Sequence, residues 1–343
     1  MRLVKCNHLD LSRFQFDHDL TFAVFFLNPE GTLYARYGSR TGQDADEDVS
    51  LEGLAATMTQ VLDLHRNWPG NRDLLVAKQP RPVARRYPEE YPALQQFRPE
   101  LDHAGETART CIHCHQVRDA ARIEWRGRGQ PWPLKLLFPW PAADRMGLIL
   151  DVDSAATIRE VVPGSPAARA GVLPGDQLET INGSDISSPA DVSWILHHLA
   201  DDDSLQLGLD RRGVRVMAEI GLPPDWRQQT DISWRPTSWD LRRMATGGMV
   251  LHAATVAERE GLGIDQHAMA LRVGHVGQYG DHGRANRAGL RTGDWVVGVD
   301  DRDDLPTESA LVEYAIQEKR PGETLTIHYL RGGHRRTTSI ELQ

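Results

Sequence analysis

The fold is decided by a stretch that occurs twice, as PAARAGVLPGDQLETING at 166–183 and as RANRAGLRTGDWVVGVDD at 284–301. Ala170-Gly171 corresponds to Ala288-Gly289, and Gly175-Asp176 corresponds to Gly293-Asp294. Small residues let a short helix turn tightly, and the glycine before each aspartate suits a backbone conformation that side chains disfavour. The repeat therefore predicts two copies of one structural unit in the back two-thirds of the chain.

The segments that follow each copy also correspond. Apolar runs at 177–181 and 295–299 predict buried strands, and helices are expected at 189–199 and 307–317. Each copy then ends in a predicted hairpin, 205–209 with 214–220 and 325–330 with 335–342, which turns at Arg212-Gly213 and Gly332-Gly333. The matching order of elements extends the repeat well beyond its most similar residues.

This pattern resembles bacterial-type PDZ domains. The resemblance implies a carboxylate-binding loop ahead of each domain, which we place at Met146-Gly147-Leu148-Ile149 and at Gly261-Leu262-Gly263-Ile264. In PDZ domains the N–H groups of this loop hold the terminal carboxylate of a peptide that adds to the adjoining sheet edge. The implied partners are protein C-termini or peptides. The alternative is that segments of the chain itself fill one or both grooves, and Met146 departs from the aromatic residue or glycine usual in this loop.

The front of the chain predicts a smaller structure. Residues 1–6, 21–27 and 32–37 read as strands, and the last two are joined by the turn Asn28-Pro-Glu-Gly31. Ser50 is a predicted N-cap for a helix. Its apolar face is formed by Leu51, Leu54, Met58, Val61, Leu62 and His65. Strand, hairpin and covering helix match the back half of a thioredoxin-like fold.

A second resemblance rests on the stretch DHDLTFAVFFLNPEGTLYARYG at 17–38, a cysteine motif at 111–115 and DISWR at 231–235. These segments resemble the thioredoxin-like/PDZ (seleno)protein family of predicted exported bacterial proteins. The resemblance implies a thioredoxin-type active site, sometimes with selenocysteine, just upstream of this chain. Met1 is then expected to be an internal methionine, and the chain as given holds no assignable thioredoxin active site.

The cysteine motif is Cys111-Ile-His-Cys114-His115. Its spacing is that of covalent c-type haem attachment, in which the thiols of Cys111 and Cys114 bind the porphyrin and His115 ligates the iron. A helix over 116–125 would carry His115 on its first turn. A sixth ligand is not assignable, with candidates at His103, Met58 and Met146.

Three other interpretations of these cysteines remain open. Zinc could be bound with His113 or His115 as a third ligand, although no second ligand pair follows at finger spacing. A dithiol redox pair is a further interpretation, but no strand precedes Cys111. The last is two unmodified thiols.

Two proline-containing segments, the first also rich in arginine, are predicted to connect the domains. Residues 67–99 show too little periodicity for a regular element, and 131–141 form an aromatic, proline-stiffened stretch. Between the repeats, residues 226–249 combine Trp234 and Trp239 with Arg235, Arg242 and Arg243. We interpret this last segment as a packed linker rather than an anion site.

Composition excludes several classes of function. The chain has 343 residues and a net charge of -9, which argues against nucleic acid as the main partner. No apolar run is long enough to span a membrane, and no signal peptide is visible. Periplasmic or exported localisation is therefore expected if the true N-terminus lies upstream, and cytoplasmic localisation if the chain is complete. Nucleophile stretches of serine hydrolases, Walker loops and dinucleotide fingerprints are not found.

The sequence thus predicts an α+β multidomain protein. The expected parts are a partial thioredoxin-like domain (1–68), a connector with the cysteine motif (69–144), a first PDZ domain (145–222), a Trp/Arg linker (223–250) and a second PDZ domain (251–343). The main functional hypothesis is an exported redox or electron-transfer protein with covalent haem c, a redox partner protein and PDZ modules for targeting. The alternative is a non-catalytic PDZ scaffold that binds protein C-termini, with structural or zinc-bound cysteines.

Overall fold

The structure is a computed structural model that describes residues 3–44, 47–97, 110–200 and 204–343. The chain forms two compact units. Unit 1 comprises residues 1–90, 97–114 and 138–230, and unit 2 comprises residues 91–96, 115–137 and 231–343. Each unit contains one copy of the sequence repeat, so we describe them in turn. Among the described residues, no helix is both long and apolar enough to cross a membrane.

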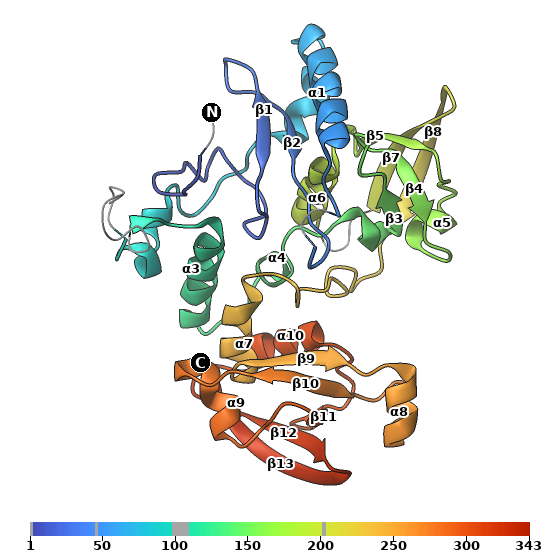
Figure 1. Cartoon of the computed structure of the whole chain (residues 1–343). Helices are drawn as coiled ribbons and strands as arrows, with labels where there is room; N and C mark the ends of the chain where they lie inside the picture. The colour runs from blue at the N-terminus through green and yellow to red at the C-terminus, as the bar shows by residue number, and fades with distance from the viewer. Residues whose placement is uncertain (1–2, 45–46, 98–109, 201–203) are drawn as a thin grey trace. The chain divides into compact units, whose positions relative to one another are not determined.

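Unit 1 begins with a hairpin and a helix. Strand β1 (Val24–Leu27) pairs antiparallel with β2 (Leu33–Tyr37), and helix α1 (Leu51–Arg66) follows (Figure 1). The side chain of Ser50 accepts a hydrogen bond from the N–H of Gly53 and caps α1. These elements confirm the predicted strands at 21–27 and 32–37 and the predicted cap.

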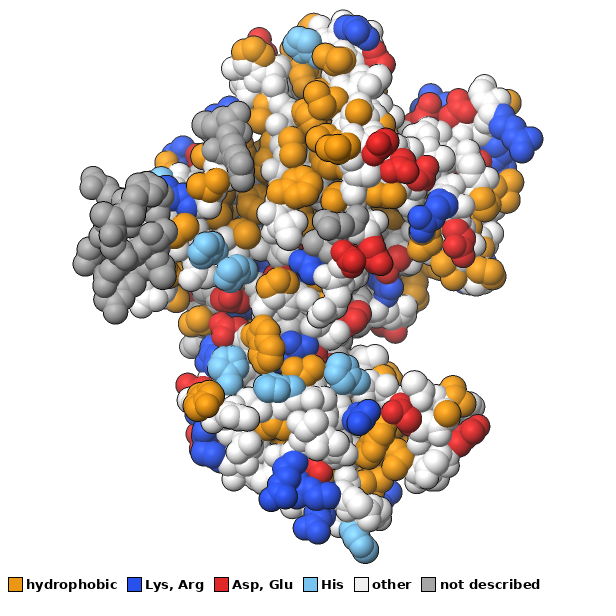
Figure 2. All heavy atoms as spheres, in the orientation of Figure 1, with side chains coloured by type: hydrophobic (Ala, Val, Ile, Leu, Met, Phe, Trp, Pro, Cys, Tyr) orange, Lys and Arg blue, Asp and Glu red, His pale blue; other side chains and the backbone are white. Residues whose placement is uncertain are grey.

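The thioredoxin-like interpretation of this region is wrong. Within the described residues β1 and β2 form a sheet of two strands only, and residues 3–6 are not a strand. The hairpin packs against α1 and other helices of unit 1 instead of extending into a wider sheet. On α1, Val61 and Leu64 pack near Tyr34. Leu51, Met58 and Leu62 stay exposed, and Figure 2 shows hydrophobic side chains gathered on this part of the surface.

Short helices make up most of the connector. They are the 3-10 helices η1 (Arg72–Lys78), η2 (Pro88–Glu90) and η3 (Pro92–Leu94), then α3 (Cys114–Gly127), α4 (Leu134–Leu137) and η4 (Ala143–Met146). The prediction of a helix over 116–125 is confirmed by α3. The 3-10 helices were not predicted, because single turns closed by local bonds leave no periodic pattern in the sequence.

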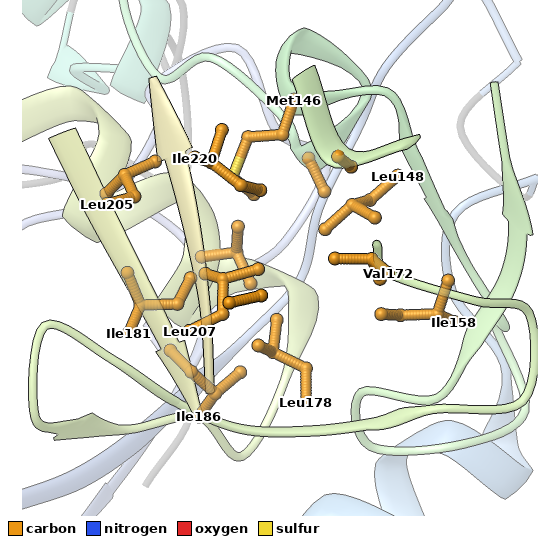
Figure 3. Close-up of a cluster of buried hydrophobic side chains, with 14 of the residues drawn as sticks. Met146, Leu148, Ile158, Val172, Leu178, Ile181, Ile186, Leu205, Leu207 and Ile220 are labelled. Carbon is orange, nitrogen blue, oxygen red and sulfur yellow. The ribbon is translucent and has the colours of Figure 1, made fainter. Parts of the chain in front are cut away.

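The first repeat completes unit 1. Its elements are β3 (Leu148–Leu150), β4 (Ile158–Val161), α5 (Pro166–Arg169), β5 (Gln177–Ile181), β6 (Ser184–Asp185), α6 (Pro189–His198), β7 (Ser204–Arg211) and β8 (Val214–Gly221). Strand β3 pairs with β4, and a second sheet has the order β6-β5-β7-β8. Figure 3 shows the core between these elements, in which Met146, Leu148 and Ile158 meet Leu178 and Leu207.

The second repeat lies in unit 2. Its elements are α7 (Ser238–Thr246), β9 (Met249–Ala253), α8 (Val256–Leu262), β10 (Leu271–Val276), η5 (Gly280–Gly283), α9 (Arg284–Arg287), β11 (Trp295–Val299), α10 (Glu308–Glu318), β12 (Thr324–Arg331) and β13 (His334–Glu341). One sheet has the order β13-β12-β11-β10-β9, with β9 at an edge. The predicted helices and terminal hairpins of both repeats are confirmed.

The Gly-Asp pair of the repeat has the same structural role in both copies. Gly175 and Gly293 have φ of 88° and 91°, a region that favours glycine. Arg211 donates from Nε to Asp176 over 2.7 Å, and Arg331 donates to Asp294 over the same distance. The repeated residues therefore build the same turn in both repeats, and an arginine of the terminal hairpin anchors it.

Candidate functional site

The clearest candidate site is the outer edge of strand β3 in the first repeat. The N–H of Val162 donates to the carbonyl of Gly147 (2.9 Å), and the N–H of Asp151 donates to the carbonyl of Thr157 (2.8 Å). Residues 147 and 151 therefore face β4. Because backbone groups alternate along a strand, those of Leu148 and Leu150 face the other side. Within the described part of the chain β3 pairs with β4 alone, so no described strand is hydrogen-bonded to this side.

The predicted loop Met146–Ile149 lies directly before and within this strand. Gly147 has a φ of 83°, and a Cβ there would lie 2.1 Å from the Cβ of Ser165, so only glycine fits. Met146 ends η4 and is fully buried in the core. The buried side chain of Met146 thus anchors the loop. This role explains why a methionine can replace the aromatic residue or glycine that is usual in PDZ carboxylate-binding loops. Its burial also removes it as an accessible iron ligand, whereas Met58 is exposed on α1.

Helix α6 of the same repeat contacts η4, which directly precedes the Gly147 loop. Trp140 stacks on His197 with ring centroids 4.8 Å apart and an interplanar angle of 7°. The backbone nitrogen of Trp140 lies 3.2 Å from His197 Nδ1. Ala190 and Ser193 on the same helix line a small pocket that Trp140 also lines. Residues from just before η4 therefore cover the C-terminal end of α6.

Strand β2 bonds to the start of α6, and the N-cap of α1 bonds to a residue just past β3. Ser188 Oγ donates to the carbonyl of Arg36 (2.5 Å), and the N–H of Arg36 donates to Asp191 (3.3 Å). Ser50 Oγ donates to the carbonyl of Val152 (2.9 Å), just past β3. The start of α6 and the end of β3 are thus both tied to the region of β2 and α1.

A buried ion pair fixes α6 to the connector. Lys78 Nζ lies 2.7 Å from Asp185 and 2.9 Å from Asp191, and the Lys78 side chain is fully buried. Burial raises the pKa of Asp191, although Lys78 acts in the opposite direction. Burial also lowers the pKa of Arg36, which lies over Trp194, to about 10. These charges face away from the core of the repeat and join it to η1 and β2.

The corresponding edge in the second repeat is closed. The N–H of Leu251 in β9 donates to Oε1 of Glu308 at the start of α10 over 2.8 Å. Arg242 of α7 donates from Nε (3.0 Å) and Nη2 (2.6 Å) to the same carboxylate. Both charged side chains are buried, with 6% and 4% of their surfaces exposed. A strand added to β9 would have to displace this clamp, which we call the Arg242–Glu308 clamp.

The linker before β9 supports the clamp. Arg242 also donates to the carbonyl of Ser233 (2.7 Å), and the N–H of Ile232 donates to Ser309 of α10 (3.1 Å). Arg235 lies 4.6 Å from the ring centre of Trp234. The part of the Trp/Arg linker in unit 2 is therefore packed on the second repeat.

The second predicted loop, residues 261–264, lies at the end of a helix and not directly before a strand. Gly261 and Leu262 end helix α8, and Gly263 is its left-handed C-cap, with the N–H of Ile264 bonded back to the carbonyl of Arg259 (3.0 Å). The glycines mark a helix end rather than a loop before a strand. Gly247 and Gly248, with φ of 63° and 90°, directly precede β9 as Gly147 precedes Leu148. Aligning the segment before β9 with that before β3 would have found them.

The cysteine motif is closely packed. Helix α3 begins at Cys114, which places His115 in its first turn as predicted. Cys111 is buried, and the backbone of Ile112 is bonded to Cys6 and Asn7. The Cys111 thiol is therefore largely covered, and haem attachment at Cys111, Cys114 and His115 stays a prediction. No group of three or more potential metal ligands occurs among the described residues, and His103 lies outside them.

Comparison with known proteins places a PDZ domain in the first repeat. A PDZ-domain family model matches residues 157–211. A probable periplasmic serine endoprotease, DegP-like, of Hahella chejuensis is 24% identical over 189 residues, which are 54% of this chain and 38% of that protein. The periplasmic pH-dependent serine endoprotease DegQ of Escherichia coli is 36% identical over 73 residues, 21% of this chain and 16% of that protein. The chain thus spans well under half the length of these relatives.

Solved structures give partial matches of the same kind. A serine endoprotease from Yersinia pestis has 21% identity and a TM-score of 0.21 over 22% of this chain and 27% of that chain. The HtrA3 PDZ domain bound to a phage-derived ligand, FGRWV, has 23% identity and a TM-score of 0.19 over 21% of this chain and 67% of that domain.

These comparisons correct the main functional hypothesis. The curated relatives are periplasmic serine endoproteases of the DegP type, not haem or thioredoxin-like redox proteins. The prediction of an electron-transfer protein with a redox partner is therefore wrong. The alternative, a PDZ scaffold, agrees better with what is found. The mixed α+β fold with a PDZ domain is confirmed, and the PDZ match lies in the first of the two repeats.

Proposed function

We propose that this chain is an exported, non-catalytic binding protein that takes the C-terminal segment of a partner protein along strand β3. The observation that carries the proposal is the edge of β3 beside the Gly147 loop, to which no described strand is bonded. This edge lies in the same unit as residues 157–211, which match the PDZ family model. The periplasmic relatives support export. Their protease activity is not part of the proposal, because the sequence holds no Gly-Asn-Ser-Gly-Gly or Gly-x-Ser-x-Gly stretch.

The geometry gives each part of a peptide a partner. Backbone groups of Leu148 and Leu150 would pair with an added antiparallel strand. The N–H of Gly147 is already bonded to the carbonyl of Asp144 (2.8 Å). The terminal carboxylate of the peptide would therefore be held by N–H groups of residues that follow Gly147. Ile149 and the exposed part of α6 would contact the side chains of the bound peptide and so set the preference among peptide sequences.

Only the first repeat is proposed as a binding site in this conformation. In the second repeat the N–H of Leu251, which an added strand would need, is bonded to Glu308. Opening this edge would leave the buried guanidinium of Arg242 without its carboxylate, which is costly. We therefore assign the second repeat a structural role.

Binding to β3 is testable with a defined probe. The peptide FGRWV, the ligand named for the HtrA3 PDZ domain, is labelled at its N-terminus and titrated with the full chain while fluorescence anisotropy is followed. We expect saturable binding that weakens at least about tenfold when the peptide carboxylate is amidated, since a charge-assisted set of hydrogen bonds is lost. Equal binding of the two peptides, or no saturable binding, contradicts the proposal.

A matched pair of variants tests the site itself. Leu150→Pro removes one N–H from the free edge, and proline is tolerated on edge strands. Leu150→Ala changes the same side chain but keeps the N–H. We expect the proline variant to lose FGRWV binding and the alanine variant to keep most of it, with both showing wild-type circular dichroism. Similar binding by both variants would mean that the peptide does not pair with β3.

A further inference from the structure

Helix α1 carries an apolar face that is exposed to solvent. Leu51, Met58 and Leu62 have 80%, 49% and 53% of their surfaces exposed, and Ala55 between them is exposed as well. Hydrophobic side chains gather over this helix in Figure 2. We call Leu51, Ala55, Met58 and Leu62 the α1 stripe. A contiguous apolar surface of this kind on a soluble protein marks a candidate interface.

The α1 stripe has the spacing of a seam between two packed helices. Its members follow one another at intervals of four, three and four residues, which is the 3.5-residue period of coiled coils. The buried residues of the helix, Gly53, Thr57 and Leu64, lie on the other side. Gly53 packs so closely that a Cβ there would lie 2.2 Å from the carbonyl oxygen of Val152. Helix α1 is therefore held in unit 1 by one face, and the stripe is left over.

The charges beside the stripe differ between the two ends of the helix. Glu52 lies in the first turn and Arg66 in the last, and their separation of two heptads puts both on the same flank of the stripe. Arg66 donates from Nη1 to Asp63 over 2.5 Å but is 71% exposed, so most of its N–H groups can take a further acceptor. An antiparallel helix of the same sequence would bring Arg66 of each copy to Glu52 of the other. A parallel helix would put like charges at the same level.

We propose that the α1 stripe is the interface of a homodimer in which the α1 helices of two copies pack antiparallel. Met58 of each copy lies at the two-fold axis, and Leu62 of one copy packs against Ala55 of the other, whose small side chain leaves room for it. Burial of the exposed apolar surface supplies the attraction. The two Glu52–Arg66 pairs select the antiparallel orientation. Because the same patch serves both copies, association stops at two chains.

Sedimentation equilibrium of the full chain tests for this dimer. We expect a mean mass that rises from one chain toward two as the concentration increases. Met58→Glu places a carboxylate from each copy at the axis and is expected to weaken the dimer at least about a hundredfold, since apolar burial is lost and like charges meet. Met217→Glu, the same change at a 61% exposed methionine of β8, is the matched control and should dimerise as wild type does. A mass of one chain at every concentration, or a dimer that persists in Met58→Glu, overturns the proposal.

A charge exchange tests the antiparallel orientation. Glu52→Arg and Arg66→Glu each turn two attractions per dimer into two repulsions, and each should weaken the dimer about tenfold. The double variant again has opposite charges at each contact and should recover most of the affinity, with circular dichroism showing that all three variants are folded. Glu30→Arg, at an exposed turn position, carries the same charge change and should have little effect. A double variant as weak as the single ones contradicts the antiparallel pairing. These outcomes are independent of peptide binding at β3.

Discussion

Strands β3 and β9 hold the same position in their repeats but present different edges. Leu148 and Leu150 of β3 direct backbone groups away from β4, toward a side that no other described strand covers. On β9 the corresponding N–H, that of Leu251, is bonded to Glu308, which Arg242 holds in place. Two copies of one fold thus offer one open edge and one closed edge.

A single position accounts for much of this difference. Helices α6 and α10 both follow a capping residue, Ser188 and Thr307, whose side chain accepts a bond from the third helical residue. The first residue after the cap is Pro189 in one repeat and Glu308 in the other. Proline has no group that could bond a strand N–H, whereas the carboxylate reaches across the groove. The first repeat instead has its buried carboxylate at Asp191, which faces Lys78.

The largest expected effect is from Glu308→Ala, which removes the acceptor of the Arg242–Glu308 clamp. A buried guanidinium cannot lose its charge, so we expect unit 2 to be destabilised by about 3–5 kcal/mol. Calorimetric unfolding of the full chain measures this. Glu318→Ala, an exposed position on the same helix, is the control and should change little. A loss below about 1 kcal/mol would show that the clamp does not hold the β9 edge closed.

Lys78→Met is expected to have the next largest effect, about 2–3 kcal/mol on unit 1, because Asp191 can take up a proton when its cation is lost. Burial already raises the pKa of Asp191, so its charged form destabilises the folded state above the ordinary pKa of the group. This cost falls as pH decreases through the raised pKa. The deficit of Lys78→Met relative to wild type should therefore shrink between pH 7 and pH 5 in urea unfolding.

A deficit that is constant or grows over that range would contradict this account of Lys78. Arg81→Met is a suitable control, since Arg81 is an exposed cation near the end of the same 3-10 helix. It should leave the unfolding midpoint of unit 1 nearly unchanged at both pH values.

A smaller effect is expected from Ser50→Ala. This change removes the N-cap of α1 and the bond to the carbonyl of Val152 past β3, and it should cost about 1 kcal/mol. If these contacts narrow the groove of the first repeat, FGRWV should bind the variant more tightly than wild type. Thr59→Ala, which removes a hydroxyl on the exposed face of α1, is the matched control. Weaker binding by Ser50→Ala would mean that Ser50 supports the site instead of restricting it.

The smallest effect is expected where the two repeats agree. Arg211→Ala and Arg331→Ala each remove the arginine that binds the aspartate of the Gly-Asp turn. The arginine side chains are 31% and 27% exposed, so water can replace their bonds, and each aspartate keeps a bond from the backbone N–H of Leu173 or Arg291. Each variant should therefore lower its unit's melting temperature by less than about 2 °C. Similar small losses of melting temperature in both variants would show that the two Gly-Asp turns are equivalent and that the repeats differ at the edges of β3 and β9. A large loss from one variant alone would show that the two turns are not equivalent.

Much of the architecture could be predicted because it depends on local patterns. The glycines at 175 and 293, the cap at Ser50 and the apolar runs of the terminal hairpins each act over a few residues, and all of these elements are found as expected. The thioredoxin-like interpretation failed although its hairpin and helix exist. A strand and a helix do not determine which partners they pack against, and β2 packs on helices instead of joining a larger sheet.

The candidate site was predictable only in part, for a related reason. The sequence alone determined the repeat, the PDZ-like order of elements and the Gly147 loop, because each is encoded by neighbouring residues. The loop with Gly263 matched the expected pattern better than the Gly147 loop, but Gly263 ends a helix, since the same glycine conformation serves both purposes. Only the tertiary structure decided that Glu308 closes β9, that β3 stays open and that Asn7 bonds to Ile112. These outcomes depend on contacts between residues tens to more than a hundred positions apart, and such contacts leave no local pattern in the chain.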